Sequence, residues 1–385
     1  MSRKPIIFER DVRMARRQQR LGRLMRLGVL LLVAIAIALA SLYFYHRLAA
    51  EEQAARNRLR TFAELRASAL HRFLRAHEQE TALWASQRSM RQLARRYIGQ
   101  WQAMTPQERA SVRQMLSPAR QGKAASRAES ALNTLRTDAI NAFLALHRQT
   151  LSGMQAFLEH HGYANIHFLT PEGDLVFSAR PRADFGQNLA INGSLYAGRA
   201  LGQAFQRALR LISPGQVVFE DFQPYPQPDS PPRAFFAAPL LELEGEKVGV
   251  MAIELDTAPI DRILDANGAL GPDALIYAVG PDMRLRNNLP GRPEPTALRL
   301  RMDSPAIRKA LDGEQAIGTW KNDKGQRRIA IASPMNFSTV RWAVITEMPL
   351  DDMRKPYAPY KLLWGLAIAL ILLLGAVQYW LVRRG

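Results

Sequence analysis

The hydrophobic and polar positions of this chain fall into two patterns. Residues 27–45 and 362–382 are runs without a charged residue, and each is long enough to cross a hydrocarbon core of about 30 Å as a helix. Between them, short apolar runs alternate with turn residues such as Gly and Pro, a pattern typical of strands. These patterns predict two membrane spans, at 27–45 and 360–382, on either side of a folded, sheet-containing part.

The segment from residue 165 to 255 predicts one complete module. Two apolar runs between residues 166 and 177 are joined by Pro171-Glu-Gly-Asp174, whose residue types favour a hairpin turn. Apolar residues recur at helical spacing over 195–212, where we expect a helix. Three further strands are predicted, and together these elements form an antiparallel sheet of about five strands. The three strands are 216–222, 234–241 and 247–255.

The same order of elements returns further along the chain. A second hairpin is predicted over 275–286 and a second helix over 304–311, followed by strands at 316–320, 328–334 and 340–347. The loops differ in length between the two copies, which indicates a repeat of fold and not a solenoid of fixed period. The alternative is that two unrelated mixed domains look alike at this level.

Several short motifs in this region occur in a fixed order: GYANIHFLTPEGDLVFS at 162–178, DFGQNL at 184–189, EDFQPY at 220–225 and FFAAP at 235–239. Together they resemble the double-Cache extracytoplasmic domain of bacterial transmembrane receptors such as chemoreceptors. The resemblance covers residues 50–350. It implies an α+β fold of two tandem PAS-like Cache modules with antiparallel sheets beside long stalk helices, and a small ligand in the membrane-distal module. The amino-acid-binding pattern of some members is not visible around Tyr196, so an amino-acid ligand is not implied.

Charge gives the orientation of the spans. The net charge is +18, and residues 1–26 carry nine Arg and Lys against two acidic residues. Basic segments beside a span stay in the cytoplasm and attract anionic membrane lipid, so we expect a two-pass protein of the bacterial inner membrane with its main domain in the periplasm. A cleavable signal peptide is the alternative for the first span, because Ala38-Leu-Ala40 resembles a cleavage site. The basic excess lies beside the membrane, which argues against nucleic-acid binding.

We therefore predict seven segments. They are a cytoplasmic basic tail at 1–26, a first span at 27–45, a periplasmic helical stalk at 46–162, the membrane-distal Cache module at 163–256, the membrane-proximal module at 257–350, a second span at 360–382 and a cytoplasmic end at 383–385.

The stalk has no helix breaker for a long stretch. Neither Gly nor Pro occurs between Gly28 and Gly99, so the first membrane helix is expected to continue outward unbroken. Thr105-Pro-Gln-Glu108 is a capping box at the start of a short helix. A polar connector at 117–127 then leads to a helix over 128–160. The apolar face of that helix suits a homodimer contact or an ordinary core equally well.

Candidate ligand-binding side chains lie in the first module. The loop 224–232, rich in Pro, follows a predicted strand and is expected to form the rim of a concave site. Polar groups and an apolar wall are both present, as ligand pockets usually require. The alternative is that the Phe residues are sheet core and Asp221 caps a turn. The candidate residues are Phe168, Phe177, Ser178, Tyr196, Asp221, Phe222, Tyr225 and Phe235.

Catalytic chemistry is scarce in this sequence. No Ser/His/Asp order, phosphate loop or zinc motif is present, and the chain has no Cys for a disulfide or a thiolate ligand. His160 and His161 are adjacent at a helix end, where interaction with the helix C-terminus is the expected role, and not metal binding with His167. We predict a protein that is not an enzyme, with no catalytic residue, no cofactor and no metal.

The predicted function is that of an extracytoplasmic sensor. Only three residues follow the second span, so we expect the signal to pass through the membrane helices to a separate signalling protein in the cytoplasm. The alternative is a periplasmic binding or scaffold subunit of an envelope complex that has no signalling output.

Overall fold

The computed structural model describes residues 7–116, 137–190, 194–226, 230–242, 244–266, 268–321, 325–354 and 358–384. The chain divides into two units. One unit consists of Met1–Arg60, Lys321–Arg328 and Met348–Gly385, and the other of Thr61–Trp320 and Ile329–Glu347. The first unit contains the apolar helices, and the second contains most of both sheets.

Within the described part of the chain, two helices are long and apolar enough to span a membrane, as the sequence predicts. They are α1 (Ile7–Ser86), of which only the N-terminal part belongs to the first unit, and α10 (Ala358–Arg384). A short helix, α9 (Leu350–Arg354), precedes α10. Most of the large apolar side chains of the two apolar stretches are exposed, as lipid-facing side chains are. This arrangement fits a two-pass membrane protein.

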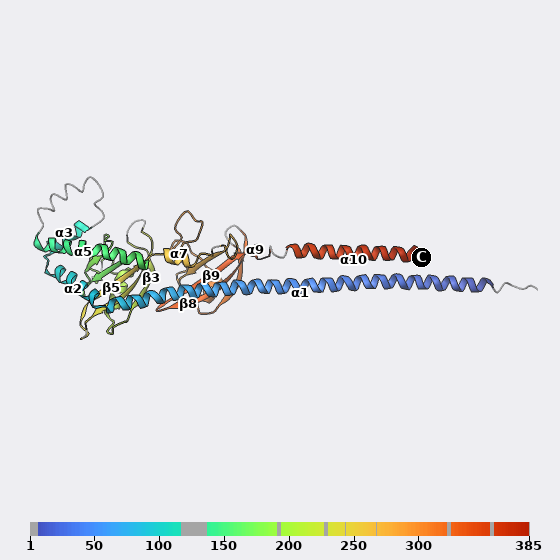
Figure 1. Cartoon of the computed structure of the whole chain (residues 1–385), viewed down its shortest axis with the longest axis horizontal. Helices are drawn as coiled ribbons and strands as arrows, with labels where there is room; N and C mark the ends of the chain where they lie inside the picture. Colours follow the sequence, from blue (N-terminus) through green and yellow to red (C-terminus); the bar gives the residue numbers. More distant parts are fainter. Residues whose placement is uncertain are drawn as a thin grey trace, which may run out of the picture. The chain divides into compact units, whose positions relative to one another are not determined.

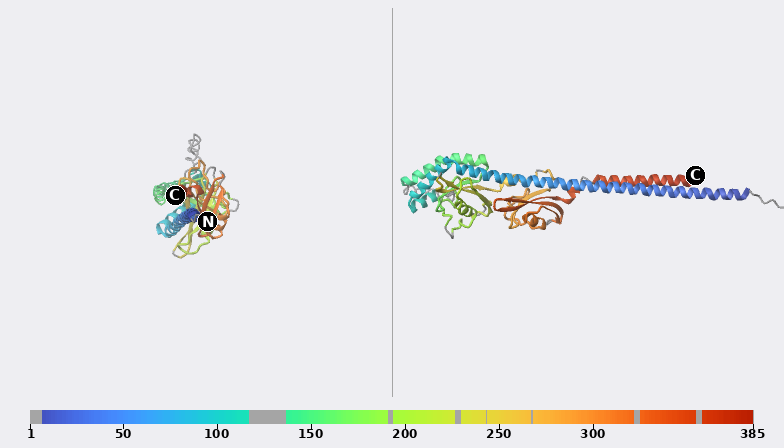
Figure 2. Two further views of the ribbon diagram at one scale, coloured as in Figure 1. Left: turned by 90° about the vertical axis from the view of Figure 1, so that its right-hand side faces the viewer. Right: turned by 90° about the horizontal axis from the view of Figure 1, so that it is seen from below.

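The two apolar helices lie side by side within their unit (Figures 1 and 2). The rings of Phe44 and Trp364 stack with their centroids 5.6 Å apart. Further along, a Cβ at Gly375 would lie 2.4 Å from Cγ2 of Val33, so this Gly permits the close approach of the backbones that small residues allow in membranes. Residue numbers fall along α10 as they rise along α1, which makes the two helices antiparallel.

The first sheet contains the five antiparallel strands that the sequence predicts, in the order β2-β1-β5-β4-β3. Their apolar runs are almost wholly buried, because helices cover both faces. The strands are β1 (Asn165–Leu169), β2 (Leu175–Ser178), β3 (Val218–Gln223), β4 (Arg233–Leu241) and β5 (Lys247–Leu255).

The second sheet repeats this topology with four strands, in the order β6-β9-β8-β7. This order matches β1-β5-β4-β3, so the α+β fold with two tandem sheets is confirmed. Even the register agrees, since Asn165 pairs with Glu254 and Leu275 with Glu347. The strands are β6 (Leu275–Val279), β7 (Ala316–Lys321), β8 (Arg327–Phe337) and β9 (Val340–Pro349).

The second arm of the predicted hairpin at 275–286 is not a strand. Leu285 forms only an isolated bridge with Val279. Its backbone N–H donates to Leu300 O, while the N–H of Arg286 donates to Ala278 O. These are isolated bridges, and they do not extend into a ladder.

Helices cover the first sheet on both sides. α6 (Ala200–Leu209) packs on one face against β3, β4 and β5, while α2 (Arg88–Ala103) and α5 (Asp138–His161) belong to the other side. In the second module α8 (Pro305–Leu311) packs on the sheet, and α7 (Ala258–Ile263) lies between the two sheets in the sequence. These helices place one apolar core inside each module.

Two predicted helix boundaries differ from the structure, and a third lies outside the described residues. α6 is shorter than 195–212, because the preceding turn folds back so closely that a Cβ at Gly202 would lie 2.5 Å from the carbonyl oxygens of Tyr196 and Ala197. The stalk helix is not continuous to residue 99, since Gln87 is extended (φ −73°, ψ 133°) and separates α1 from α2. α5 begins at Asp138; the predicted helix start at 128 and the connector at 117–127 lie outside the described residues.

The predicted capping box is confirmed at the start of α3 (Pro106–Leu116). The N–H of Thr105 donates to Glu108 Oε2 at 2.8 Å, and the N–H of Glu108 donates to Thr105 Oγ1 at 3.3 Å. Two backbone donors that the helix leaves unpaired are thereby satisfied.

Candidate functional site

A buried polar network lies on the face of the first sheet that α6 covers. Leu169, Phe235, Val250 and Ala252 line the apolar core on this face. Since side chains of one face recur at every second position of a strand, the next positions on this face are His167 on β1, Arg233 on β4 and Glu254 on β5. The apolar face of the sheet therefore ends in three ionisable side chains.

Glu254 is the centre of this network. Its side chain is fully buried, and it accepts a hydrogen bond from Arg182 Nη1 at 2.9 Å. His167 Nε2 lies 3.1 Å from the same carboxylate, and Arg233 Nε lies 2.9 Å from its other oxygen. Burial alone would raise the pKa of Glu254, but the hydrogen bond with His167 and the charge of Arg182 outweigh it and hold this pKa at about 2.

Two loops complete the network. Asp184 lies in the loop after β2 and is fully buried; its Oδ2 accepts a hydrogen bond from the hydroxyl of Tyr225, which follows β3. The guanidinium of Arg182 lies 5.3 Å from the centroid of the Tyr225 ring, a cation–π distance. Burial raises the pKa of Asp184, although the nearby charges of His167 and Arg182 act in the opposite direction.

Several polar atoms of the network have no hydrogen-bond partner. They are Asp184 Oδ1, His167 Nδ1 and the Nε and Nη1 of Arg233. Arg233 is close enough to Glu254 for an ion pair, but its N–H groups are not aligned with the carboxylate. Buried polar atoms are rarely left unpaired, and such atoms call for an explanation such as a ligand or bound water. The network thus contains both acceptor and donor atoms that have no partner.

The predicted site residues fall into three groups. Tyr196, Tyr225 and Phe235 lie in the core that α6 covers, next to the network; the two Tyr rings are 6.3 Å apart, and Phe235 is 6.0 Å from His167. These three residues are brought together, and they adjoin the unpaired polar atoms.

Of the other five, Ser178 pairs with His167 across β1 and β2 and so lies on the face of the network. The remaining four lie elsewhere. Phe168 and Phe177 stack on each other at 5.1 Å and contact Tyr97 of α2, on the opposite side of the sheet from α6. Ser178 is buried and accepts a hydrogen bond from Asn165 Nδ2.

Asp221 and Phe222 contact the second module. The carboxylate of Asp221 binds the guanidinium of Arg286, and the Phe222 ring lies 6.2 Å from that of Trp342. The structure therefore does not bring these two residues into the group around Tyr225.

Arg182, Asp184, Arg233 and Glu254 were not among the predicted site residues. The available signal was a charged residue at the end of an apolar run, as at Arg233 and Glu254, but strand ends are often charged simply because they reach solvent. His167 was considered only for a metal. Among the described residues, no group of three His, Asp or Glu side chains is arranged to hold a metal ion.

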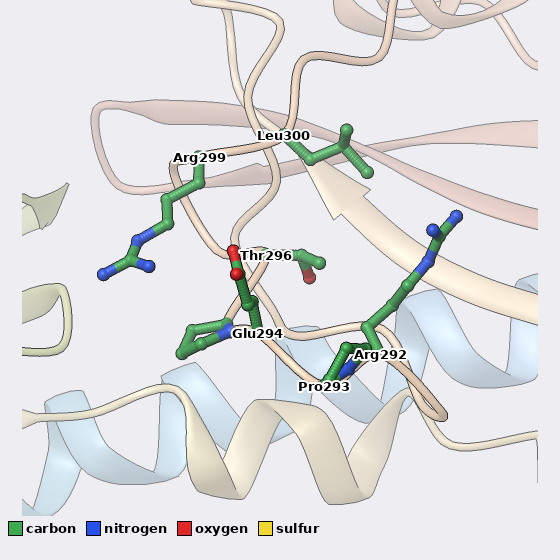
Figure 3. A pocket seen from close by; sticks show the side chains of 7 residues that line it. Arg292, Pro293, Glu294, Thr296, Arg299 and Leu300 are labelled. Atoms are coloured by element: carbon green, nitrogen blue, oxygen red, sulfur yellow. The ribbon is translucent and has the colours of Figure 1, made fainter.

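A hollow of about 320 Å³ lies on the second module. Arg292 and Arg299 flank it, with Glu294 between them, and their guanidinium groups point away from each other (Figure 3). Side chains that diverge in this way do not converge on one ligand, so we regard the network of the first module as the better candidate.

The chain matches solved structures. No protein-family model and no curated protein matches the chain. The ligand-binding domain of the Pseudomonas fluorescens chemoreceptor CtaA, solved with L-serine, aligns over 77% of this chain and 97% of its own length, with 12% identity and a TM-score of 0.42.

Two further solved structures align over similar lengths. The ligand-binding domain of the Pseudomonas aeruginosa amino-acid chemoreceptor PctC, solved with GABA, covers 76% of this chain and 99% of its own, with 12% identity and a TM-score of 0.40. The extracellular domain assigned to a histidine kinase aligns over 84% of this chain and 96% of its own length, with 12% identity and a TM-score of 0.43. All three alignments are at low identity, and the fold described above rests on the strand order of this chain itself.

Proposed function

We propose that this protein is a membrane-anchored extracytoplasmic sensor whose first module binds a small polar ligand and whose membrane helices pass the signal to a separate cytoplasmic protein. The inner membrane of a bacterium, with the sheets on the periplasmic side, is the proposed location. Two antiparallel apolar helices enclose the tandem modules in the sequence, which supports a domain held outside by a two-pass anchor.

The observation that carries this proposal is the set of unpaired buried atoms around Asp184, His167 and Arg233. Asp184 Oδ1 accepts a hydrogen bond from a cationic or hydroxyl group, and Arg233 donates to an anionic one. The chemistry suits a small molecule that carries both kinds of group. Tyr196, Tyr225 and Phe235 supply the adjoining apolar and hydroxyl surface.

A thermal-shift screen of the full chain in detergent tests the proposal, with a panel of small charged and zwitterionic metabolites. A ligand present at a hundred times its Kd stabilises the native state by about 2.7 kcal/mol. Asp184→Asn keeps the shape but removes the charge, and it should abolish the shift. Glu242→Gln is the matched control, because Glu242 pairs with Arg95 outside the network.

The outcome also separates the sensor from the alternative. A shift that Asp184→Asn removes and Glu242→Gln keeps supports the sensor. If no compound of the panel shifts the melting temperature, or if both variants lose the shift equally, the site is misplaced and the scaffold reading is favoured. We further propose a homodimer and contact of the basic tail with anionic lipid, to be tested by crosslinking in membranes and by vesicle binding.

A further inference from the structure

The two modules are joined by a partly buried charged contact. Asp221 on β3 of the first module accepts hydrogen bonds from Arg286 of the second, with Nε at 3.1 and 3.0 Å and Nη2 at 2.9 Å from its oxygens. Trp342 Nε1 on β9 donates to the same carboxylate at 3.1 Å. Arg286 is only 4% exposed, so water screens this contact weakly. We call these three residues the inter-module clamp.

The second module is shaped to hold this guanidinium. Arg286 Nη1 also donates to Asp282 at 2.8 Å and to the carbonyl of Arg284 at 2.9 Å. A Cβ at Gly280 would lie 2.0 Å from Arg286 Nη2. The absence of a side chain at Gly280 is therefore what leaves room for the clamp.

The clamp also holds a bulge in the first module. The register between β3 and β4 slips between Glu220 and Gln223. A bulge leaves a backbone group outside the ladder, and here the N–H of Phe222 donates to Asp221 Oδ1 at 2.7 Å. One carboxylate thus fixes both the path of β3 and the position of the second module.

The same segment reaches the candidate ligand site. After the bulge β3 ends at Gln223, and Tyr225 follows one residue later and donates its hydroxyl to Asp184. Two residues separate Tyr225 from Phe222 of the bulge. Packed elements of this kind shift between discrete arrangements and do not deform smoothly.

We propose that β3 and its bulge couple the buried network of the first module to the second module through the inter-module clamp. Occupation of the network repositions Tyr225, and the bulge passes this change to Arg286 and Trp342. The ligand part of this inference rests on the proposed function. The mechanical part does not, because the coupling exists in the ligand-free protein and is reciprocal.

Hydrogen–deuterium exchange of the full chain in detergent, without ligand, tests the coupling from both ends. Tyr225→Phe removes only the hydroxyl and should speed exchange of residues 280–288 about tenfold, since a hydrogen bond to a charged group is worth roughly that factor or more. Gly280→Ala should displace Arg286 and speed exchange of residues 182–189 in the other module.

Each variant has a matched control. Tyr163→Phe also removes a hydroxyl that donates to a carboxylate. Here the acceptor is Glu80, which is not part of β3. Gly318→Ala adds a methyl group in the second module at an ordinary 3.5 Å from Ala306. Both controls should change exchange only near the substitution.

Effects of Tyr225→Phe confined to the first module, or of Gly280→Ala confined to the second, would overturn the proposal. If Gly280→Ala fails to fold, Arg286→Lys keeps the charge, loses the two-nitrogen contact, and is expected to give the same distant change. A failed ligand screen together with coupled exchange would refute the proposed function alone, whereas a positive screen with uncoupled exchange would refute only this inference.

Discussion

Glu254→Gln is the most direct test of the buried network. The substitution keeps the volume of the side chain and removes its charge, which leaves the guanidinium groups of Arg182 and Arg233 beside a neutral amide. Removing one partner of a buried ion pair typically costs about 3–5 kcal/mol, because the remaining charge is desolvated without compensation. Glu254 is fully buried, so this cost is not reduced by solvent.

The pKa of Glu254 gives an independent value for the contribution of this side chain to the free energy of unfolding. Folding lowers this pKa from its usual 4.5 to about 2, and each unit corresponds to about 1.4 kcal/mol, hence about 3 kcal/mol in all. A carboxyl group with a lowered pKa stabilises the fold fully above pH 4.5, and this contribution is lost as the pH falls towards 2. Glu254→Gln should lack this part of the acid sensitivity.

Scanning calorimetry of the full chain in detergent measures the effect. For a domain of this size, a loss of about 3–5 kcal/mol lowers the melting temperature by roughly 6–20 °C. Glu242→Gln, which breaks a partly exposed pair with Arg95, should cost less than about 1 kcal/mol. A Glu254→Gln variant as stable as Glu242→Gln would refute the reasoning, since the network would then contribute no charge compensation.

Three further outcomes are expected. Burial lowers the pKa of His147 to about 4, so the free energy of unfolding should fall by up to about 1.4 kcal/mol per pH unit as the pH drops from 6.5 towards 4. His147→Phe should remove this dependence in calorimetric measurements at different pH, and an unchanged slope would contradict the prediction. Gly375→Leu should lower disulfide yield between Phe44→Cys and Trp364→Cys in membranes, because leucine does not fit against the facing helix; equal yield would argue against close packing. Alkaline phosphatase fused within residues 117–127 should be active, whereas an inactive fusion would place the modules in the cytoplasm.

The sequence by itself determined the features that depend on local chemistry. The two apolar runs identify spans because only a continuous helix satisfies its backbone in lipid. The capping box at Thr105 is confirmed because its partners lie three residues apart. The repeat of strand patterns predicted two tandem sheets, and even the register agrees between Glu254 and Glu347.

Only the tertiary structure decided which helix covers the face of the sheet on which each strand residue lies. Alternation shows that Phe168 and Phe235 lie on a face of a sheet, but not that α2 covers the first and α6 the second. The sequence likewise could not show that Arg286 pairs with Asp221, or Arg182 with Glu254. These partners are far apart in the sequence and are brought together by strand pairing and by contact between the modules. Charges distant in the chain become one site only when the fold removes the water between them.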